Sequence, residues 1–369
     1  MIPTLVGVSL LITALVRLLP GDAVDILLNE GGSSQGPASL KLVVDEQLVK
    51  DGVDPLKATF DQRSKAERTV LTPKLEELGF APNTTDTAQV QQAKNELGLE
   101  LYKDSIRAEL GIDKNYIEQW WAWSSKAMRG DLGESLVGDR SIGGELKRRI
   151  PASFQLGIMA MTVSALVALP VGVISAVKQD TWIDYFTRSF AIAMLALPSF
   201  FIATLVIAFA ARLWDYSFPI FYADFWDDPA ANLELVTVPA IILGVGLSGT
   251  LMRLTRAQML EVMRQDYMRT ARSKGLTQKV VVMRHGVRNA FIPVVTVIGL
   301  QIPVLIGGSL VLEQIFGIPG VAQYLFAAIG LRDFPTIIGV NMVVALTIMM
   351  SNLLVDLTYA YLDPRIRLS

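Results

Sequence analysis

The sequence predicts an all-α, polytopic membrane protein with six transmembrane helices. Its 369 residues are 51% hydrophobic and only 18% charged, which is too apolar for an ordinary soluble domain of this size. Six segments approach or reach the roughly 17 to 25 apolar residues that a helix needs to cross a bilayer. They lack the alternation of barrel strands, so helices are the economical way to satisfy their backbone groups. The segments are residues 2–19, 152–177, 189–211, 236–252, 291–312 and 336–360.

The first of these segments, within residues 1–20, is predicted to be an uncleaved transmembrane helix. A signal peptide would carry a basic n-region and a small-residue cleavage site, and the segment has neither in clear form. Arg17 lies near its outer end, where a long side chain can reach the membrane interface.

The basic loop between the fourth and fifth segments, residues 253–288, determines the predicted orientation. Short loops rich in Lys and Arg stay on the cytoplasmic side of a membrane. With this loop inside, the tail "DPRIRLS", the short segment "KQDTWIDYFTR" and the N-terminus are predicted to be cytoplasmic as well. Residues 21–150, which carry an excess of acidic residues, then face outward.

Residues 21–150 are the one sizeable region outside the predicted membrane helices, and residues 151–369 are predicted to form the membrane core. Charged runs separated by Gly, Pro and Asn predict a mostly helical extracytoplasmic cap. Within it, Trp120, Trp121 and Trp123 are predicted to pack, or to lie at the membrane surface, rather than to bind a ligand.

The basic loop contains the most informative stretch of the sequence, "DYMRTARSKGL", residues 266–276. We expect Gly275 to adopt the left-handed conformation that ends one helix, and the hydroxyl of Thr277 to cap the next. The small residues Thr270, Ala271 and Gly275 would keep the surface flat enough for another protein to approach. The alternative is that the basic residues only orient the membrane helices and contact anionic lipid.

The longer stretch "DYMRTARSKGLTQKVVVMRHGVRNAFIPVVTVIGLQ" resembles the cytoplasmic coupling loop of ABC importer permeases of the dipeptide, oligopeptide and nickel family. The broader permease superfamily has Glu-Ala-Ala, three variable residues and Gly; here Arg269-Thr270-Ala271 precede Gly275, as in the peptide branch. Further similar stretches, in family order, are "IPTLVGVSLLITALVRLLPGD", "RGDLGESL", "ALPSFF" and "NLLVDLTYAYLDPRIR". The chain most resembles the first, B-type, of two paired permeases, with a longer outer region than the family pattern.

The resemblance implies the type I ABC importer permease fold in the inner membrane of a prokaryotic cell, with both termini cytoplasmic. It implies a second permease subunit, two cytosolic ATPase subunits, an extracytoplasmic solute-binding protein and membrane lipid as partners, and no nucleic acid. The 266–279 loop would dock in a groove of an ATPase and couple ATP hydrolysis to transport. The cargo implied is a di- or oligopeptide, with nickel chelate, glutathione and oligosaccharide left open. The coupling residues implied are Asp266, Tyr267, Arg269, Thr270, Ala271, Arg272, Lys274, Gly275 and Leu276.

Catalytic chemistry is not expected of this chain. It has no Gly-x-x-x-x-Gly-Lys-Ser/Thr phosphate loop, so ATP and Mg would be bound by the partner ATPases and no cofactor by this chain. One Gly-x-Ser-x-Gly match surrounds Ser34, on the predicted opposite side of the membrane from the single histidine, His285, which argues against a hydrolytic triad. One histidine and no cysteine also argue against a transition-metal site.

Two other functional classes remain as alternatives. An ATP-independent channel or secondary transporter would show inverted repeats and carboxylates along the pathway, and neither is clear in the sequence. A membrane-anchored enzyme would need a catalytic constellation in the outer region, where Ser34 has no evident partner.

Polar residues within the last two predicted helices are candidates for lining the translocation pathway, because a polar cargo needs a hydrogen-bonding route. The alternative is that each satisfies a neighbouring helix. Pro198, Pro293 and Pro303 are expected to kink helices that must rearrange. The pathway candidates are Gln301, Asn341, Ser351 and Asn352.

Overall fold

The computed structural model describes residues 2–18, 36–77, 93–101, 104, 115–135, 137, 140–219, 221–302, 310–331 and 333–362. Across these residues the chain forms helices and no β-strand, which confirms the all-α prediction. Ser34 and Pro303 lie outside the described residues. The chain divides into two compact units. One comprises Met1–Leu5, Arg140–Ala328 and Gly339–Ser369, and the other Val6–Asp139 and Ile329–Ile338.

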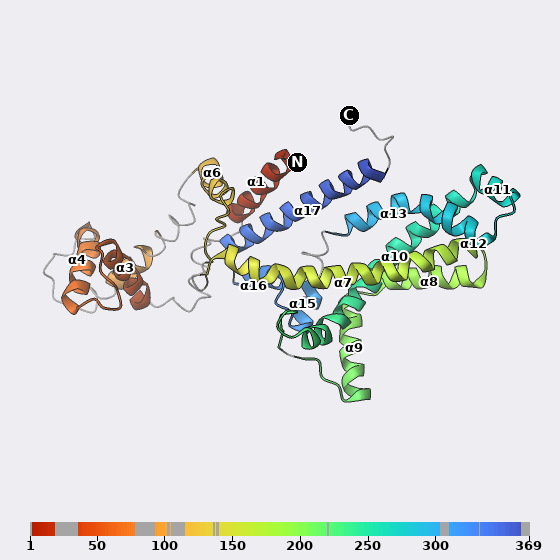
Figure 1. Ribbon diagram of the computed structural model, residues 1–369. Coiled ribbons are helices and arrows are strands. Elements are labelled where there is room, and N and C mark those ends of the chain that lie inside the picture. Colours follow the sequence, from red (N-terminus) through yellow and green to blue (C-terminus); the bar gives the residue numbers. More distant parts are fainter. Residues whose placement is uncertain are drawn as a thin grey trace. The chain divides into compact units, whose positions relative to one another are not determined.

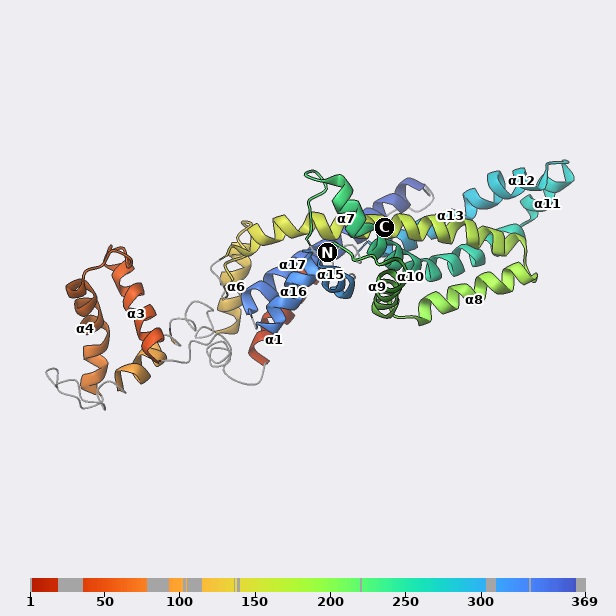
Figure 2. The same ribbon diagram turned by 90° about the horizontal axis from the view of Figure 1, so that it is seen from below.

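Two long helices, α7 (Ile142–Val177) and α10 (Pro229–Met263), form the centre of the larger unit. They run side by side in Figures 1 and 2 and contact each other extensively. Glycines permit this close approach: a Cβ added to Gly172 would lie 2.9 Å from the carbonyl oxygen of Met252, and one on Gly244 would lie 2.5 Å from a backbone oxygen of α7. The two helices therefore pack backbone against backbone.

The segment predicted as one span over residues 189–211 is instead two helices. α8 (Trp182–Ala196) and α9 (Ser199–Trp214) meet at an angle of 95°. Pro198 lies at the bend, where its ring and missing N–H prevent the helix from continuing. Pro198 was predicted to kink a helix, and the structure shows a much sharper turn at this residue.

The predicted span over residues 291–312 is also interrupted. α13 (Arg288–Leu300) ends in a turn, and a separate helix, α15 (Leu310–Phe316), begins beyond it. α15 is followed by α16 (Val321–Gly330), and these two helices form a second sharp bend, of 89°. Gly317, with φ at +66°, allows the chain to leave α15 in a conformation that other residues rarely adopt.

By length and apolar composition, three of the described helices can cross a membrane: α7, α10 and the residues Phe334–Val355 of α17 (Phe334–Leu362). The number rises to six if each of three bent pairs counts as one span. These include α15 with α16, which the sequence analysis did not propose as a span. The predicted first span is the helix α1 (Ile2–Leu18), which has 17 residues.

The smaller unit contains a helical hairpin of α3 (Gly36–Lys50) and α4 (Phe60–Glu77). Val44, Leu48 and Ala66 form its buried core. The first turn of α4 is capped by reciprocal bonds between Thr59 and Gln62, the pattern of a capping box. The described part of residues 21–150 is thus mostly helical, as predicted.

A further helix of this unit, α6 (Tyr116–Ala127), contacts α1 through polar side chains. The phenol of Tyr116 donates to the carbonyl of Leu10, and the indole N–H of Trp120 donates to the Ser9 hydroxyl at 2.8 Å. Trp121, by contrast, is 59% exposed. Trp120 therefore contributes to helix packing, which is one of the two settings predicted for the tryptophan cluster.

The stretch "RGDLGESL" contributes to the start of α17. Ser135 donates its hydroxyl to the buried carboxylate of Asp333 at 2.5 Å, and Thr336 donates to the same oxygen at 2.6 Å. Asp333 also accepts the backbone N–H of Thr336 at 3.4 Å, the bond of a helix N-cap.

Candidate functional site

Residues 266–287, here called the loop segment, follow α10 as three short elements. They are α11 (Asp266–Ser273), α12 (Gln278–Val280) and the π-helical η1 (Val281–Val287). Figures 1 and 2 show α11 and α12 next to each other. This arrangement confirms the predicted helix, turn and helix, and adds a π-helix that the sequence analysis did not anticipate.

The inner face of the loop segment is a small apolar core. Met268, Ala271 and Val281 are buried together, and Val262 and Met263 from the end of α10 pack against them. Met268 and Ala271 are three residues apart and so lie on one face of α11. The core joins α11 to α10 by packed side chains, so a displacement of α11 is transmitted to α10 by direct contact.

The outer face of the loop segment is exposed and polar. The side chain of Arg269 is 75% exposed, and its only ionic contact among the described residues, to Asp266 at 3.6 Å, lies on the surface. Eight of the nine predicted coupling residues lie exposed: Asp266, Tyr267, Arg269, Thr270, Arg272, Lys274, Gly275 and Leu276.

Ala271 differs from these eight because it points into the core. Only 7% of its surface is exposed, so the prediction that it keeps the outer surface flat is wrong. The reason is the i to i+3 spacing with Met268, which places both residues on the buried face of a helix of only eight residues. Ala271 can affect the outer face only through the packing of α11.

Two predictions concern the turn between α11 and α12: the structure confirms the one for Gly275, and the one for Thr277 is wrong. Gly275 has φ at +75°, and its N–H donates to the carbonyl of Arg272 at 2.9 Å, as expected for a left-handed residue that ends a helix. Thr277 occupies the N-cap position of α12, but its hydroxyl makes no capping hydrogen bond. Because this turn is exposed, water can satisfy the first N–H groups of α12.

The π-helix η1 completes the attachment to α10. A Cβ on Gly286 would lie 3.2 Å from the terminal methyl of Met259 and 3.6 Å from that of Met268, so the small residue lets η1 approach both. Just beyond η1, the amide of Asn289 donates to the Tyr267 hydroxyl at 3.3 Å and to the carbonyl of His285 at 2.8 Å. π-helical turns often occur at functional sites.

Comparison with known proteins identifies the family of this chain. Residues 168–368 match the family model described as "Binding-protein-dependent transport system inner membrane component". The chain belongs to this family of ABC importer permeases. A glutathione transport system permease of Pectobacterium atrosepticum is 36% identical over 266 residues, covering 72% of this chain and 84% of the relative. A peptide transport system permease protein of Brucella abortus is 39% identical over 267 residues, with the same two coverages.

These findings confirm the resemblance to the peptide and nickel branch. The chain is thus a multi-pass permease subunit of an ATP-driven importer and not its ATPase. One solved structure, described as an amino acid ABC transporter with histidines, aligns with 65% of this chain and 98% of its own at a TM-score of 0.44 and 14% identity. That likeness is too low to define the fold.

The pathway candidates of the permease lie in different settings. The amide of Gln301, at the end of α13, donates to the carbonyl of Leu247 on α10 at 3.4 Å, which is a contact between helices. On α17, Ser351 is buried, Asn341 is half-buried and Asn352 is exposed. The adjacent residues Ser351 and Asn352 therefore differ in exposure, and all four remain predictions as pathway residues.

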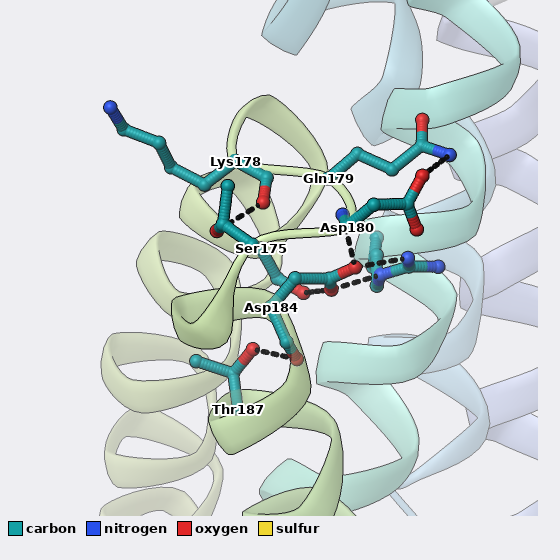
Figure 3. A network of polar contacts seen from close by, with 8 residues as sticks. Ser175, Lys178, Gln179, Asp180, Asp184 and Thr187 are labelled. Carbon is teal, nitrogen blue, oxygen red and sulfur yellow. Dashed lines mark hydrogen bonds and ion pairs between the residues drawn. The ribbon is translucent and has the colours of Figure 1, made fainter.

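The sequence analysis did not predict an ion pair of the permease whose acidic partner is buried. The carboxylate of Asp184 on α8 is fully buried and accepts two bonds of 2.7 Å from Arg256 on α10, through Nε and Nη2. It also accepts the hydroxyl of Ser175 on α7 at 2.6 Å and the backbone N–H of Asp180 at 3.1 Å. Figure 3 shows Ser175, Asp180 and Asp184 meeting in this network. The sequence offered only a weak indication of this pair: Asp184 lies in the first turn of an apolar helix, and Arg256 lies near the end of another.

A second fully buried carboxyl group, that of Glu313 on α15, lies against the N-terminal half of α7. It accepts the hydroxyl of Ser153 at 2.7 Å and the backbone N–H of Gln323, in the first turn of α16, at 2.9 Å. The Ser153 hydroxyl in turn accepts the N–H of Val321 at 2.8 Å. A Cβ on Gly320 would lie 2.2 to 2.4 Å from atoms of the Glu313 carboxyl group, so this hydrogen-bonded side chain would have to move to admit a larger residue. Side chains from two other helices thus cap α16.

Proposed function

We propose that this permease forms half of a translocation pathway for small peptides and is driven by cytosolic ATPases that dock on the outer face of the loop segment. The observation that carries the proposal is the division of the loop segment into an exposed polar face and an inner core packed on α10. Such an element can receive a partner on one side and transmit its movement on the other.

The named functions of the relatives support a peptide cargo. One relative is named for peptide transport and another for glutathione transport, and glutathione is itself a tripeptide. Nickel chelate and oligosaccharide are the alternative cargoes, since a separate solute-binding protein would select what reaches the permease. This chain would bind no cofactor, and ATP with Mg would be bound by the two ATPase subunits.

The proposed orientation places the loop segment and both termini in the cytoplasm, because Lys and Arg in short loops are retained there. A second permease would complete the pathway, and an extracytoplasmic binding protein would deliver cargo to the outer face. Transport would follow alternating access, in which ATP binding favours the outward-open state and hydrolysis restores the inward-open state.

A purification under gentle detergent conditions tests the composition of the complex. The tagged chain is isolated from its native membrane, and co-eluting proteins in fixed proportion are identified by mass spectrometry. Two ATPases with phosphate loops and a second permease are expected. A chain that is isolated alone, and that conducts solute in liposomes without ATP, would contradict the proposal.

Charge reversal tests the docking face directly. The double variant Arg269→Glu with Arg272→Glu changes two exposed side chains, so it should leave folding intact and reduce ATP-driven peptide uptake at least about tenfold. Arg148→Glu is a control for charge reversal outside the loop segment: Arg148 lies on α7 and is 81% exposed, and the change also removes its ion pair with Glu145 at 3.7 Å. Equal uptake by both variants would show that the ATPases do not dock on the loop segment.

A further inference from the structure

The network around Asp184 joins three helices through one side chain. Its donors come from the end of α7, from the turn that follows it and from α10, while Asp184 itself is on α8. The two bonds from Arg256 are parallel contacts between a planar guanidinium and a planar carboxylate. Such a pair fixes the orientation of two groups as well as their distance.

The turn is also part of the network. Asp180 has φ at +60°, in the left-handed region that residues other than glycine rarely adopt, and its N–H in that conformation points to the Asp184 carboxylate. The surrounding fold must hold such a residue in place. Asp184 therefore fixes both the end of α7 and the way the chain enters α8.

Apolar packing also joins these helices. Leu251 and Met252 of α10 form a buried cluster with Ala168 of α7 and Ala191 of α8. Replacing a buried ion pair by apolar residues of similar volume is often neutral or stabilising for a fold. What the pair adds beyond packing is a directional constraint on how α10 is set against α7 and α8.

The position of Arg256 relates this constraint to the loop segment. It lies about two helical turns before the end of α10 at Met263, which packs into the inner core of the loop segment. Between the two, Met259 packs against Ala176 of α7 and close to Gly286 of η1. The ion pair is therefore the last interhelical polar contact of α10, among the described residues, before the loop segment begins.

We propose that the Asp184–Arg256 pair is a positioning clamp that makes α7, α8 and α10 move as one body when the loop segment is displaced. Without it, movement of α11 would be absorbed by bending or rotation of α10 alone. The inference rests on the proposed function, in which an ATPase displaces the loop segment. Asp184 and Arg256 act through the helices they join and need not touch the cargo.

The test compares coupling in the complete importer, assembled with its partner subunits in liposomes and supplied with a mixture of labelled di- and tripeptides. The main variant, Asp184→Leu with Arg256→Met, removes the directional bonds and keeps apolar volume. Arg256→Lys keeps the charge and loses the paired geometry. The control, Glu145→Leu with Arg149→Met, removes a partly buried ion pair at the other end of α7, with a Nε to Oε2 distance of 3.1 Å.

The readout is peptide taken up per ATP hydrolysed, a ratio that a merely structural role would not change in assembled complexes. We expect the main variant to lower this ratio at least about fivefold, Arg256→Lys to lower it by less, and the control to leave it unchanged. If both assembled clamp variants take up as much peptide per ATP as the wild type, the clamp proposal is wrong. Failure of both to assemble would also overturn it, because the pair would then be required for folding rather than coupling.

The wild-type importer distinguishes a failure of the proposed function from a failure of the clamp. If it shows no ATP-dependent uptake of the peptides, the proposed function fails and the clamp with it. If it is coupled while the clamp variants are equally coupled, only the clamp is wrong.

Discussion

Two carboxyl groups beside α7 are both fully buried, and they contribute to the fold in different ways. Asp184 binds Arg256, a side chain of another long helix, together with the hydroxyl of Ser175. Glu313 binds the hydroxyl of Ser153 and the first turn of α16. One carboxylate joins helices that run alongside each other, and the other determines where a short helix begins.

The difference follows from what each site has to fix. A helix N-terminus has N–H groups without partners and a positive end of the helix dipole, so a carboxylate there fixes the start and direction of the helix. At the 89° bend between α15 and α16 this sets the course of the chain. A bidentate ion pair instead fixes two formed helices against each other, which suits a part of the molecule that transmits movement.

The largest expected effect is that of leaving the partly buried guanidinium of Arg256, whose side chain is 19% exposed, beside a neutral partner. Asp184→Asn keeps the shape of the side chain but places an NH2 group against the donors of Arg256 and Asp180. Because Arg256 keeps some access to solvent, breaking the pair on this side should lower the free energy of unfolding by an amount at the low end of the range for buried pairs, about 3 kcal/mol. Equilibrium unfolding of the purified chain in detergent micelles measures this change.

Asp180→Asn is the matched control for this prediction, since it makes the same chemical change in an exposed side chain four positions away. It should alter the free energy of unfolding by less than about 0.5 kcal/mol. The double variant Asp184→Leu with Arg256→Met should recover most of the loss, because no buried charge remains. A double variant as unstable as Asp184→Asn would show that the pair stabilises the fold itself.

Gly320→Ala should have the next largest effect, and it tests whether the space beside the Glu313 carboxyl group is fully occupied. The added methyl would overlap the buried carboxyl group, and overpacking of this kind costs about 1–3 kcal/mol. Gly246→Ala on α10 is the control, because nothing lies within 4 Å of its added Cβ. That variant should gain about 0.5–1 kcal/mol from better helix propensity, and a loss equal to that of Gly320→Ala would contradict the steric account.

Much of the fold was predictable because it depends on local pattern. Apolar length predicts helices, and a glycine after a short amphipathic helix predicts the left-handed turn at Gly275. The inward position of Ala271 could have been derived from its spacing to Met268, but small residues alone suggested a flat surface. The prediction that the loop segment couples to an ATPase rested on a resemblance to a family and not on the chemistry of its residues.

The remaining features depend on contacts between distant parts of the chain. Asp184 and Arg256 are 72 positions apart and Ser153 and Glu313 are 160 apart, and no periodicity relates such pairs. The sharp bend at Pro198 was underestimated because a proline within an apolar run is compatible with either a kink or a complete break.

Ser153→Ala should have an intermediate effect because this hydroxyl has two partners. It donates to Glu313 and accepts the N–H of Val321, so its loss leaves a buried N–H without a partner. A cost of about 1–3 kcal/mol in unfolding free energy is expected. Ser164→Ala is the control on the same helix: its hydroxyl is buried without a hydrogen-bond partner among the described residues, so its removal should be neutral or stabilising.

Ser175→Ala should have the smallest effect of the series, although Ser175 is as buried as Ser153 and also donates to a carboxylate. Its hydroxyl is one of four donors to Asp184, and the two bonds from Arg256 and the N–H of Asp180 remain after its removal. No backbone group loses a partner, so the expected cost is about 0.5–1.5 kcal/mol. The free energies of unfolding of Ser175→Ala and Ser153→Ala are measured side by side. If Ser175→Ala loses as much stability as Ser153→Ala, or more, then the Ser175 hydroxyl is needed to hold Asp184 and the Arg256 guanidinium is not sufficient.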